Sequence, residues 1–459
     1  MSTILSGGTV VVGLQPTVVV DASVVVEGDR IIEVSAAPAA ARDHIPDASV
    51  IDCSGCLVIP GNVCAHTHAY SALARGMPYR LDAPRDFVET LRRVWWRLDR
   101  SLDEGSIAAS ARVAAMEALL AGTTTLVDHH ASPAAIDGSL DIVGDAFAEV
   151  GVRSVLAYEV TDRDGDARAR AGVAENRRLL ERVAATSPRL VRGLVGAHAS
   201  FTLSDATLEA CVDLARASGR GLHVHVAEDA ADQRDAETLH GSRVLERLER
   251  MGAMQPAPVL AHGVHLDRAE AALFRASGAT LVHNPRSNMN NAVGRAPLTT
   301  LGPRIALGTD GIGADMFEEG RVGQLRLLEE RRAPDAVPVP ADWVLERLAV
   351  GARLVGDAFA EPLLGQVVPG APADLVVLDY AAPTPVTADS LAAHWIFGLS
   401  ARAVRDVLVA GRVVVRDRHL TTVDADALAA VARTEARRLW ERLDAVGEHP
   451  FTPGEVLVG

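Results

Sequence analysis

The sequence contains no lysine, and all 45 of its basic residues are arginine. Codon or surface bias accounts for the absence, but its chemical consequences are firm. No Schiff base can form on a lysine side chain, and no phosphate-binding loop with its lysine exists. A carboxylated lysine that bridges two metal ions is excluded as well.

Cysteine and long apolar runs are also scarce. Four cysteines (Cys53, Cys56, Cys64 and Cys211) in 459 residues are too few for a disulfide scaffold. The Cys53-x-x-Cys56 pair has no second pair and lies in a predicted strand and turn, which argues against a redox or zinc site. Because no basic leader follows Met1 and no apolar stretch is long enough to span a bilayer, we expect a cytoplasmic protein without a membrane partner.

The charge balance is acidic. With 60 acidic and 45 basic residues, the formal net charge is -15. This sign disfavours binding to nucleic acid or to anionic membranes, and it leaves neutral or cationic small molecules as partners. A hydrophobic fraction of 48% and a mean hydropathy of +0.14 are typical of a folded globular enzyme.

Both ends of the chain have the pattern of antiparallel strands. β-Branched runs separated by turn residues occur at Val18–Val20 and Val24–Val26, and again at Asp374–Leu378 and Val413–Val415. We predict that residues 1–56 and 366–420 together form one composite β-sandwich. Residues 421–459 are predicted to form a C-terminal helix and a tail that pack on the body.

The central residues 57–365 alternate between strands and helices, which indicates a parallel sheet. Helical stretches rich in alanine, leucine and arginine separate most of the strands, as at Ser106–Leu120 and Ser204–Ser218. No G-x-G-x-x-G follows the first strand, so a dinucleotide-binding fold is disfavoured. We predict an α/β fold with a (β/α)8 TIM-like barrel. Its expected strands are Leu57–Ala65, Thr123–Asp128, Arg153–Val160, Leu190–His198, Gly221–Val226, Val259–His262, Ala279–His283 and Arg304–Gly308.

The ends of these strands carry most of the unusual polar residues. In a barrel of parallel strands, residues at the carboxyl ends converge on one mouth. His66 and His68 share one side of an extended segment because they are two residues apart. His225 and Asp310 end two other strands, whereas His223 lies deeper and is interpreted as packed. Three imidazoles and a carboxylate suit zinc, with ferrous iron as the alternative, and a metal ion of this kind activates water at neutral pH.

Two further strand-end residues are candidates for moving protons. Glu228 lies three residues after His225, where it can protonate a ring nitrogen of a substrate. His262 can orient the attacking water, and Asp310 can take the proton of that water. An aromatic insertion at 69–105 includes Trp95, which forms either a pocket wall or the anchor of a surface helix. Asp128, His129, Glu159 and His283 receive no role.

The motifs, taken together, resemble the amidohydrolase superfamily in its metal-dependent deaminase and chlorohydrolase branch. The resemblance covers nearly the whole chain, and several segments are similar to its SsnA-like aminohydrolases. The matching motifs are Pro60–His68, Gly122–Thr124 with Glu117, His225–Glu228, Ala261–Gly263, His283–Met289, Gly308–Gly311 and Gly370–Val376. Many relatives carry a lysine after the Ser-Asn-Met segment, where this chain has Asn290.

The resemblance implies one divalent metal ion, with His66, His68, His225 and Asp310 as its ligands. It also implies that Glu228 and His262 are catalytic and that His198 contacts the substrate. Arg286 either contacts the substrate or forms a salt bridge at the barrel mouth. The implied reaction is hydrolytic deamination of an amino-substituted N-heterocycle by a homodimer. Cyclic-amide hydrolysis and dehalogenation at the same site are the alternatives, and a catalytically inactive binding protein is disfavoured because every expected ligand is present.

Overall fold

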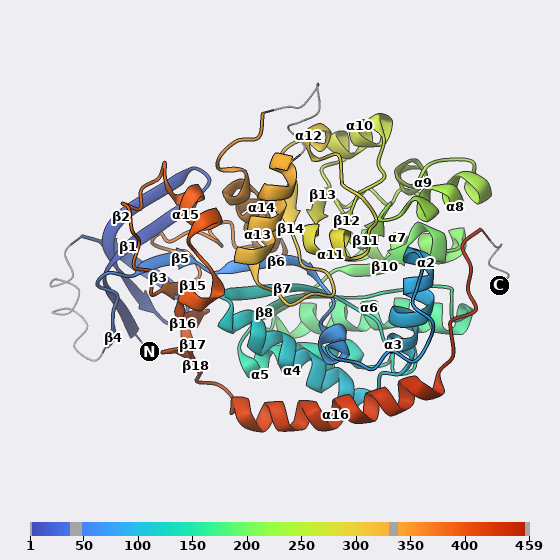
Figure 1. Ribbon diagram of the computed structural model, residues 1–459, viewed down its shortest axis with the longest axis horizontal. Helices are drawn as coiled ribbons and strands as arrows, with labels where there is room; N and C mark the ends of the chain where they lie inside the picture. The colour runs from blue at the N-terminus through green and yellow to red at the C-terminus, as the bar shows by residue number, and fades with distance from the viewer. Residues whose placement is uncertain (1, 37–47, 330–337, 455–459) are drawn as a thin grey trace.

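The computed structural model describes residues 2–36, 48–329 and 338–454, and it has a mixed α/β fold (Figure 1). One large sheet lies at one end of the molecule, and two parallel sheets with surrounding helices form the rest. Among the described residues, every helix is too short or too polar to cross a membrane.

The large sheet combines strands from both ends of the chain, as the sequence predicts. The N-terminal β5 (Leu57–Pro60) pairs in parallel with β1 (Ser2–Leu14) and antiparallel with β15 (Leu375–Leu378). These pairings join the two halves into one nine-stranded sheet. Its other strands are β2 (Thr17–Glu27), β3 (Arg30–Ser35), β4 (Ser49–Asp52), β16 (Val404–Val409), β17 (Arg412–Arg416) and β18 (His419–Leu420).

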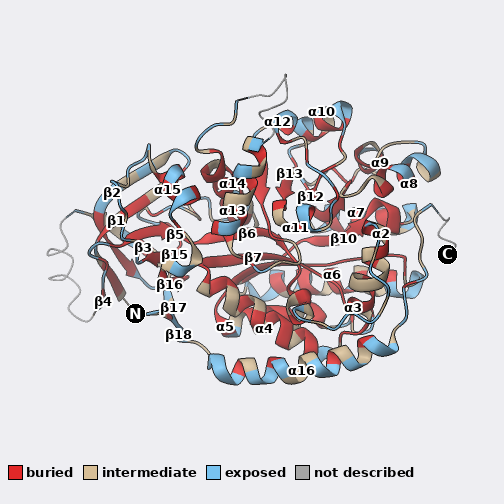
Figure 2. Ribbon diagram, viewed as in Figure 1, coloured by how far each residue is buried: buried red, intermediate tan, exposed pale blue. Residues whose placement is uncertain are grey.

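The two parallel sheets have four and five strands and are buried almost throughout (Figure 2). Buried parallel strands with helices on their outer faces are the arrangement expected from alternating elements. The four-stranded sheet contains β6 (Asn62–Thr67), β7 (Thr123–His130), β8 (Arg153–Tyr158) and β9 (Val191–Gly193). The five-stranded sheet contains β10 (Val195–Ala199), β11 (Leu222–Val226), β12 (Val259–His262), β13 (Thr280–His283) and β14 (Ile305–Leu307).

Single parallel bridges connect these two sheets. Thr67 pairs with Asp310 beyond the end of β14, and Val160 beyond the end of β8 pairs with Ala197. The five-stranded sheet therefore contacts the four-stranded sheet at the end of β6 and after β8. The helices that follow the strands include α4 (Glu104–Leu120), α5 (Ser139–Val150), α6 (Asp166–Thr186), α7 (Asp205–Ser218), α8 (Ala230–His240), α9 (Val244–Arg250), α10 (Arg268–Ser277), α11 (Pro285–Asn290), α13 (Met316–Glu329) and α14 (Trp343–Phe359).

Two expected strands are interrupted, and one of them, Leu190–His198, is divided at Leu194 into β9 of the four-stranded sheet and β10 of the five-stranded sheet. The run Leu57–Ala65 is not continuous, because β5 ends at Pro60 and joins the large sheet, while β6 begins the four-stranded sheet at Asn62. Gly61 separates them, and a Cβ atom there would lie 2.2 Å from Thr124 Oγ1. The chain therefore changes sheets at a position where only glycine fits against β7.

The C-terminal helix α16 (Ala425–Ala445) lies along α4 at the side of the molecule (Figure 1). Trp440 Nε1 donates to Leu73 O at 2.9 Å, and Arg442 Nε donates to Ser101 O at 2.7 Å. The following tail returns over the insertion, where the ring of Phe451 packs at 5.6 Å from that of Trp96. The end of the chain thus supports the segment predicted to wall the pocket.

Candidate active site and metal centre

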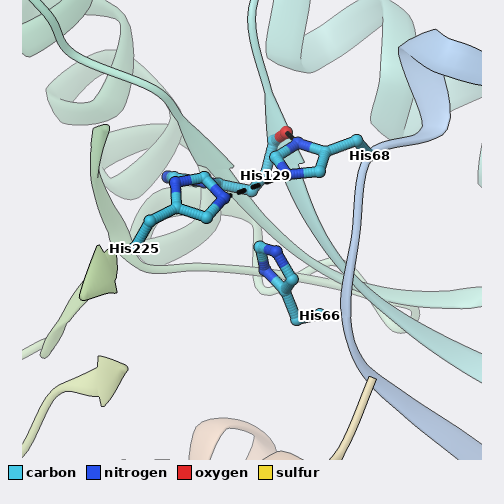
Figure 3. A group of neighbouring side chains, drawn as sticks. All are labelled: His66, His68, His129 and His225. Carbon is cyan, nitrogen blue, oxygen red and sulfur yellow. Dashed lines mark hydrogen bonds between the residues drawn. The ribbon is translucent and has the colours of Figure 1, made fainter. Parts of the chain in front are cut away.

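Five of the expected strand-end residues meet in one place. His66 and His68 come from the end of β6, His225 from β11, His262 from the end of β12, and Asp310 follows β14. One ligand atom from each of His66, His225, His262 and Asp310 lies within 4.8 Å of the others. Figure 3 shows the rings of His66, His68 and His225 together with that of His129. The strand ends therefore converge as the sequence predicts.

Backbone carbonyls fix the protons of two of these rings. His68 Nδ1 lies 2.6 Å from His129 O, and His225 Nδ1 lies 2.9 Å from His198 O. A carbonyl oxygen only accepts, so both Nδ1 atoms carry a proton and both neutral rings have a bare Nε2. The two Nε2 atoms face each other at 3.1 Å. Two lone pairs at this distance repel unless a metal ion or a proton lies between them, and without a metal ion Asp310 raises the pKa of His68 to about 9 against the effect of burial.

The remaining two imidazoles have the same orientation. His262 Nδ1 lies 2.8 Å from Asn288 Oδ1, and His66 Nδ1 lies 2.9 Å from His223 Nε2. Their Nε2 atoms are buried and have no hydrogen-bond partner among the described residues. A histidine that binds a metal ion through Nε2 needs an unprotonated Nε2 and a hydrogen-bond partner for Nδ1, and both rings have this arrangement.

The protonation state of the rings also suits a metal ion. Burial lowers the pKa of His66 to about 4, and it lowers the pKa of His225 well below its usual value. Neutral imidazole is the form that binds metals. The site therefore fits a divalent ion in both its donor atoms and their charge state.

Asp310 approaches the histidines because the backbone is strained at this point. Its Oδ1 lies 3.1 Å from His68 Nε2 and 3.7 Å from His66 Nε2, and Ser287 Oγ donates to its Oδ2. The φ of Asp310 is 56°, and a Cβ atom on Gly308 would lie 2.7 Å from His66 O. His262, with a φ of 74°, is strained in the same way. Left-handed non-glycine residues that cluster at one mouth are typical of functional sites.

Glu228 stands beside this cluster, within reach of a substrate. Its Oε2 lies 3.5 Å from His262 Nε2, and its Oε1 accepts from Asn291 Nδ2 at 3.2 Å. Burial raises the pKa of Glu228 to about 7, against the opposing effect of His262. A carboxyl group with such a pKa can carry a proton at neutral pH and give it up to a substrate.

A cavity of about 200 Å³ opens onto His68, His225, Glu228 and Asp310. Its far wall is apolar and comes largely from the insertion and from η3 (Ser200–Thr202), with Phe87, Leu91, Trp95, Trp96, Phe201 and Ile312. Trp95 ends a π-helical segment, η2 (Leu91–Trp95), and such segments often occur at functional sites. The wall combines flat apolar surface with a few polar groups, as in a site for a heteroaromatic ligand.

The three expected substrate contacts lie in different surroundings. Trp95 and His198 both line the cavity. Arg286 is absent from the lining, because its guanidinium binds Glu319, Glu318 Oε2 at 2.8 Å and Gly313 O at 2.7 Å. Arg286 was expected either to contact the substrate or to form a salt bridge, and in the structure it forms salt bridges with Glu318 and Glu319.

Residues without an expected role also surround the site. Ser287, Asn288 and Asn291 hold Asp310, His262 and Glu228, and all three belong to the Arg286–Asn291 stretch. Ser287 and Asn288 belong to the His283–Met289 motif, but the sequence does not show which side chain each of them contacts. Of the unassigned strand-end residues, Glu159 lines the cavity, and His129 stacks on His223 with ring centroids 4.5 Å apart. His283 lies outside this cavity, on a smaller one.

The known proteins to which this chain is similar include several deaminases. A 5-methylthioadenosine/S-adenosylhomocysteine deaminase from Nitratidesulfovibrio vulgaris is 31% identical over 435 residues, which are 93% of this chain and 95% of that protein. A 5'-deoxyadenosine deaminase from Methanopyrus kandleri is 30% identical over 375 residues, which cover 80% and 83% of the two chains. The crystal structure of an adenosine deaminase from Xanthomonas campestris with bound zinc superposes with a TM-score of 0.82 at 27% identity, and the match covers 97% of this chain and 99% of that one.

Parallel strands whose ends gather histidines and an aspartate define a metal-dependent hydrolase. Residues 57–414 match the sequence model of the amidohydrolase family, and the chain belongs to that family. The resemblance seen in the motifs is therefore confirmed, as is the expected class of enzyme, a hydrolase of carbon–nitrogen bonds. The expectation of a metal cofactor is confirmed by the fit of the donor set and by the zinc in the structural neighbour.

Proposed function

We propose that this protein hydrolytically deaminates an amino-substituted N-heterocycle. The observation that carries the proposal is the placement of the Glu228 carboxyl group beside four inward-facing imidazoles and Asp310, at the wall of an aromatic cavity. A proton donor next to a metal site suits the attack of water on a ring carbon and the departure of an amine. The relatives named as adenosine-type deaminases support a purine-like ring.

In this proposal, His66, His68, His225 and Asp310 hold a single divalent ion, zinc before iron. A metal ion bound there would supply a water nucleophile at neutral pH. The proposal keeps His262 outside the ligand set, because its Nε2 lies 3.5 Å from Glu228 Oε2 and 4.0 Å from Asp310 Oδ2, where it can hold the attacking water. The absence of lysine supports one ion rather than two.

The protein groups would move protons at defined atoms. Glu228 donates its proton to the ring nitrogen next to the carbon that water attacks. His262 Nε2 accepts a hydrogen bond from that water and orients it, and Asp310 Oδ2 takes its proton and passes it to the leaving amine. The hydroxyl proton of the adduct returns to Glu228 as the ring carbonyl forms, so one water enters for each ammonia released and both acids regain their starting states.

We also propose the architecture around this site. Residues 57–365 would form a closed eight-stranded barrel, in which β9 and β10 count as one strand interrupted at Leu194. The edge bridges Thr67–Asp310 and Val160–Ala197 support closure. Residues 1–56 and 366–420 would form the composite β-sandwich, and residues 421–459 the helix and tail. The homodimer and the cytoplasmic location stay predictions from the sequence.

The test is a product screen with zinc-loaded protein. Adenine nucleosides, free purines, pterins, aminopyrimidines and aminotriazines would be assayed for ammonia, chlorotriazines for chloride, and cyclic amides for the ring-opened acid. Ammonia release from at least one amino-heterocycle supports deamination. If the fully zinc-loaded protein releases no ammonia but does release chloride, or a ring-opened acid, the reaction is dehalogenation or cyclic-amide hydrolysis instead of deamination.

A further inference from the structure

Two side chains on the cavity wall each have polar atoms with unused hydrogen-bonding capacity. Glu159 follows β8 and His198 belongs to β10, and both line the cavity. Glu159 Oε1 lies 3.6 Å from His198 Nε2, which is too long for a hydrogen bond between them. Among the described residues, His198 Nε2 has no hydrogen-bond partner.

The surroundings of His198 make its Nε2 an acceptor. His198 Nδ1 lies 2.6 Å from Thr202 Oγ1, and the hydroxyl of Thr202 donates its only proton to Ala199 O at 3.2 Å. In this arrangement Thr202 accepts from His198, so Nδ1 carries the proton of the neutral ring. The Nε2 lone pair thus points to the cavity without a proton.

Glu159 is an acceptor with unused capacity. A carboxylate offers about four lone-pair positions, yet within the described part of the chain Glu159 accepts a single hydrogen bond, from Arg163 Nη1 at 3.5 Å. Arg163 is bound more closely to Asp99, and it also lies 3.5 Å from Asp164. The side chain of Glu159 is only 3% exposed, so water outside the cavity does not satisfy its oxygens.

We propose that Glu159 and His198 together bind a second N–H donor of the substrate, distinct from the amine that leaves. The two facing acceptors accommodate an exocyclic amino group, which has two N–H bonds, or a ring N–H. The substrate class is thereby an uncharged or cationic heterocycle with a second amino or ring N–H group. This inference rests on the proposed function for the identity of the leaving amine.

The position and charge of the cavity agree with this assignment. The ring centroid of His198 lies 5.4 Å from that of His225, so the acceptor pair is within the span of one heterocycle from the metal site. Five lining residues carry carboxyl groups (Glu159, Glu228, Asp229, Asp232 and Asp310), and no arginine is among the described residues of the lining. Apart from the proposed metal ion, a ligand phosphate or carboxylate would meet no cationic side chain there, whereas an N–H donor would meet acceptors.

The competing occupant is a second cation. Glu159, His198 and His225 also bring ligand atoms within 4.8 Å of one another. Zinc content therefore has to be measured in every variant. A second equivalent of zinc in the wild type that E159Q loses would overturn the inference, because the acceptor pair would then hold metal.

The test compares ligands that differ by one N–H donor. 9-Methyl-2,6-diaminopurine is paired with 9-methyladenine, and cytosine with 1-methylcytosine, because the two pairs place the donor at different ring positions. Zinc-loaded protein is assayed by kcat/KM where ammonia is released and by calorimetric Kd where it is not. We expect a preference of about tenfold or more for the donor-bearing member of at least one pair. Equal values within both pairs would overturn the inference.

Three variants test whether the preference for donor-bearing ligands depends on Glu159 and His198. E159Q replaces an acceptor oxygen by a donor, and T202V releases the proton of His198, so both should abolish the preference. E117Q is the matched control, since Glu117 is an acid already paired with Arg75 at 2.6 and 2.8 Å, and it should keep the preference. A preference that persists in both E159Q and T202V contradicts the inference. If the protein prefers the donor-bearing ligands but releases no ammonia, the proposed deamination is rejected and the acceptor pair stands. If it releases ammonia but shows no preference, the acceptor pair is rejected and deamination stands.

Discussion

His68 Nε2 and His225 Nε2 face each other at 3.1 Å, and each is bare because a backbone carbonyl holds the proton of the opposite ring nitrogen. In the neutral rings two lone pairs face each other, and a metal ion or a proton relieves their repulsion; this relationship is the physical core of the proposed metal site.

Removing one of the two rings should therefore remove the metal. We expect H225A to weaken zinc binding by more than about 100-fold, since even outer partners of ligands cost about 10–100-fold. Zinc content after dialysis against a weak chelator measures the effect. H130N is the control, because His130 is equally buried but bonds Ser132 Oγ at 3.0 Å and belongs to no candidate metal group. Loss of zinc in H130N, or full zinc in H225A, would refute the ligand assignment.

Glu228 should affect chemistry without affecting the metal. General acid–base groups contribute about 10²–10⁴-fold to rate, so E228Q should lower kcat by that range and leave KM within a few-fold. Zinc content should stay that of the wild type, because Glu228 is outside the proposed ligand set. If E228Q loses zinc in parallel with activity, Glu228 is a ligand rather than an acid.

Asn288 should act through His262. Its Oδ1 accepts from His262 Nδ1 at 2.8 Å, and it fixes which nitrogen faces the cavity. N288L should lower kcat about 10–100-fold, as the loss of an outer hydrogen-bond partner does elsewhere. Zinc content is the accompanying measurement and should not change. Undiminished kcat in folded N288L would mean that the orientation of His262 is irrelevant to turnover.

Arg286 should matter for stability rather than for substrate binding. Glu319 is fully buried, and R286M would leave its carboxylate without its cation, at a cost of about 3–5 kcal/mol. The exposed partner offers the control, since E318Q should change stability by less than about 1 kcal/mol. Denaturant unfolding measures both variants. A raised KM in R286M at unchanged stability would instead make Arg286 a substrate contact.

The destabilisation in R286M should also depend on pH. Burial raises the pKa of Glu319 to about 7 even beside Arg286, whereas the unfolded value is near 4.5. The folded protein therefore binds the proton of Glu319 more tightly, and stability falls as pH rises through this window. Without Arg286 the folded pKa rises further, so R286M should lose more stability at pH 8 than at pH 5. An equal loss at both pH values would show that Glu319 is not the affected group.

The sequence predicted the parts of the site that follow from strand periodicity. His66 and His68 share a side because they are two residues apart, and His225, His262 and Asp310 converge because parallel strands end at one mouth. Strand pairing and the joining of both chain ends into one sheet followed from β-branched runs and turn residues in the same way.

Contacts between distant segments were not predictable from the same patterns. The strand break at Gly61 depends on Thr124 in the neighbouring strand, and the surroundings of Arg286 depend on Glu319 in α13. Glu159 and His198 were visible as strand ends, but their facing acceptors depend on Thr202 and Arg163. Tautomers and hydrogen-bond partners are set by tertiary packing, which local sequence does not encode.

The account is tested most directly by titrating the metal-free protein with zinc while ammonia release from a substrate found in the screen is recorded. We predict that the rate rises linearly and stops at one equivalent of zinc per chain. Ammonia release that does not depend on zinc, a break at two equivalents, or no ammonia from any amino-heterocycle at full loading would contradict it.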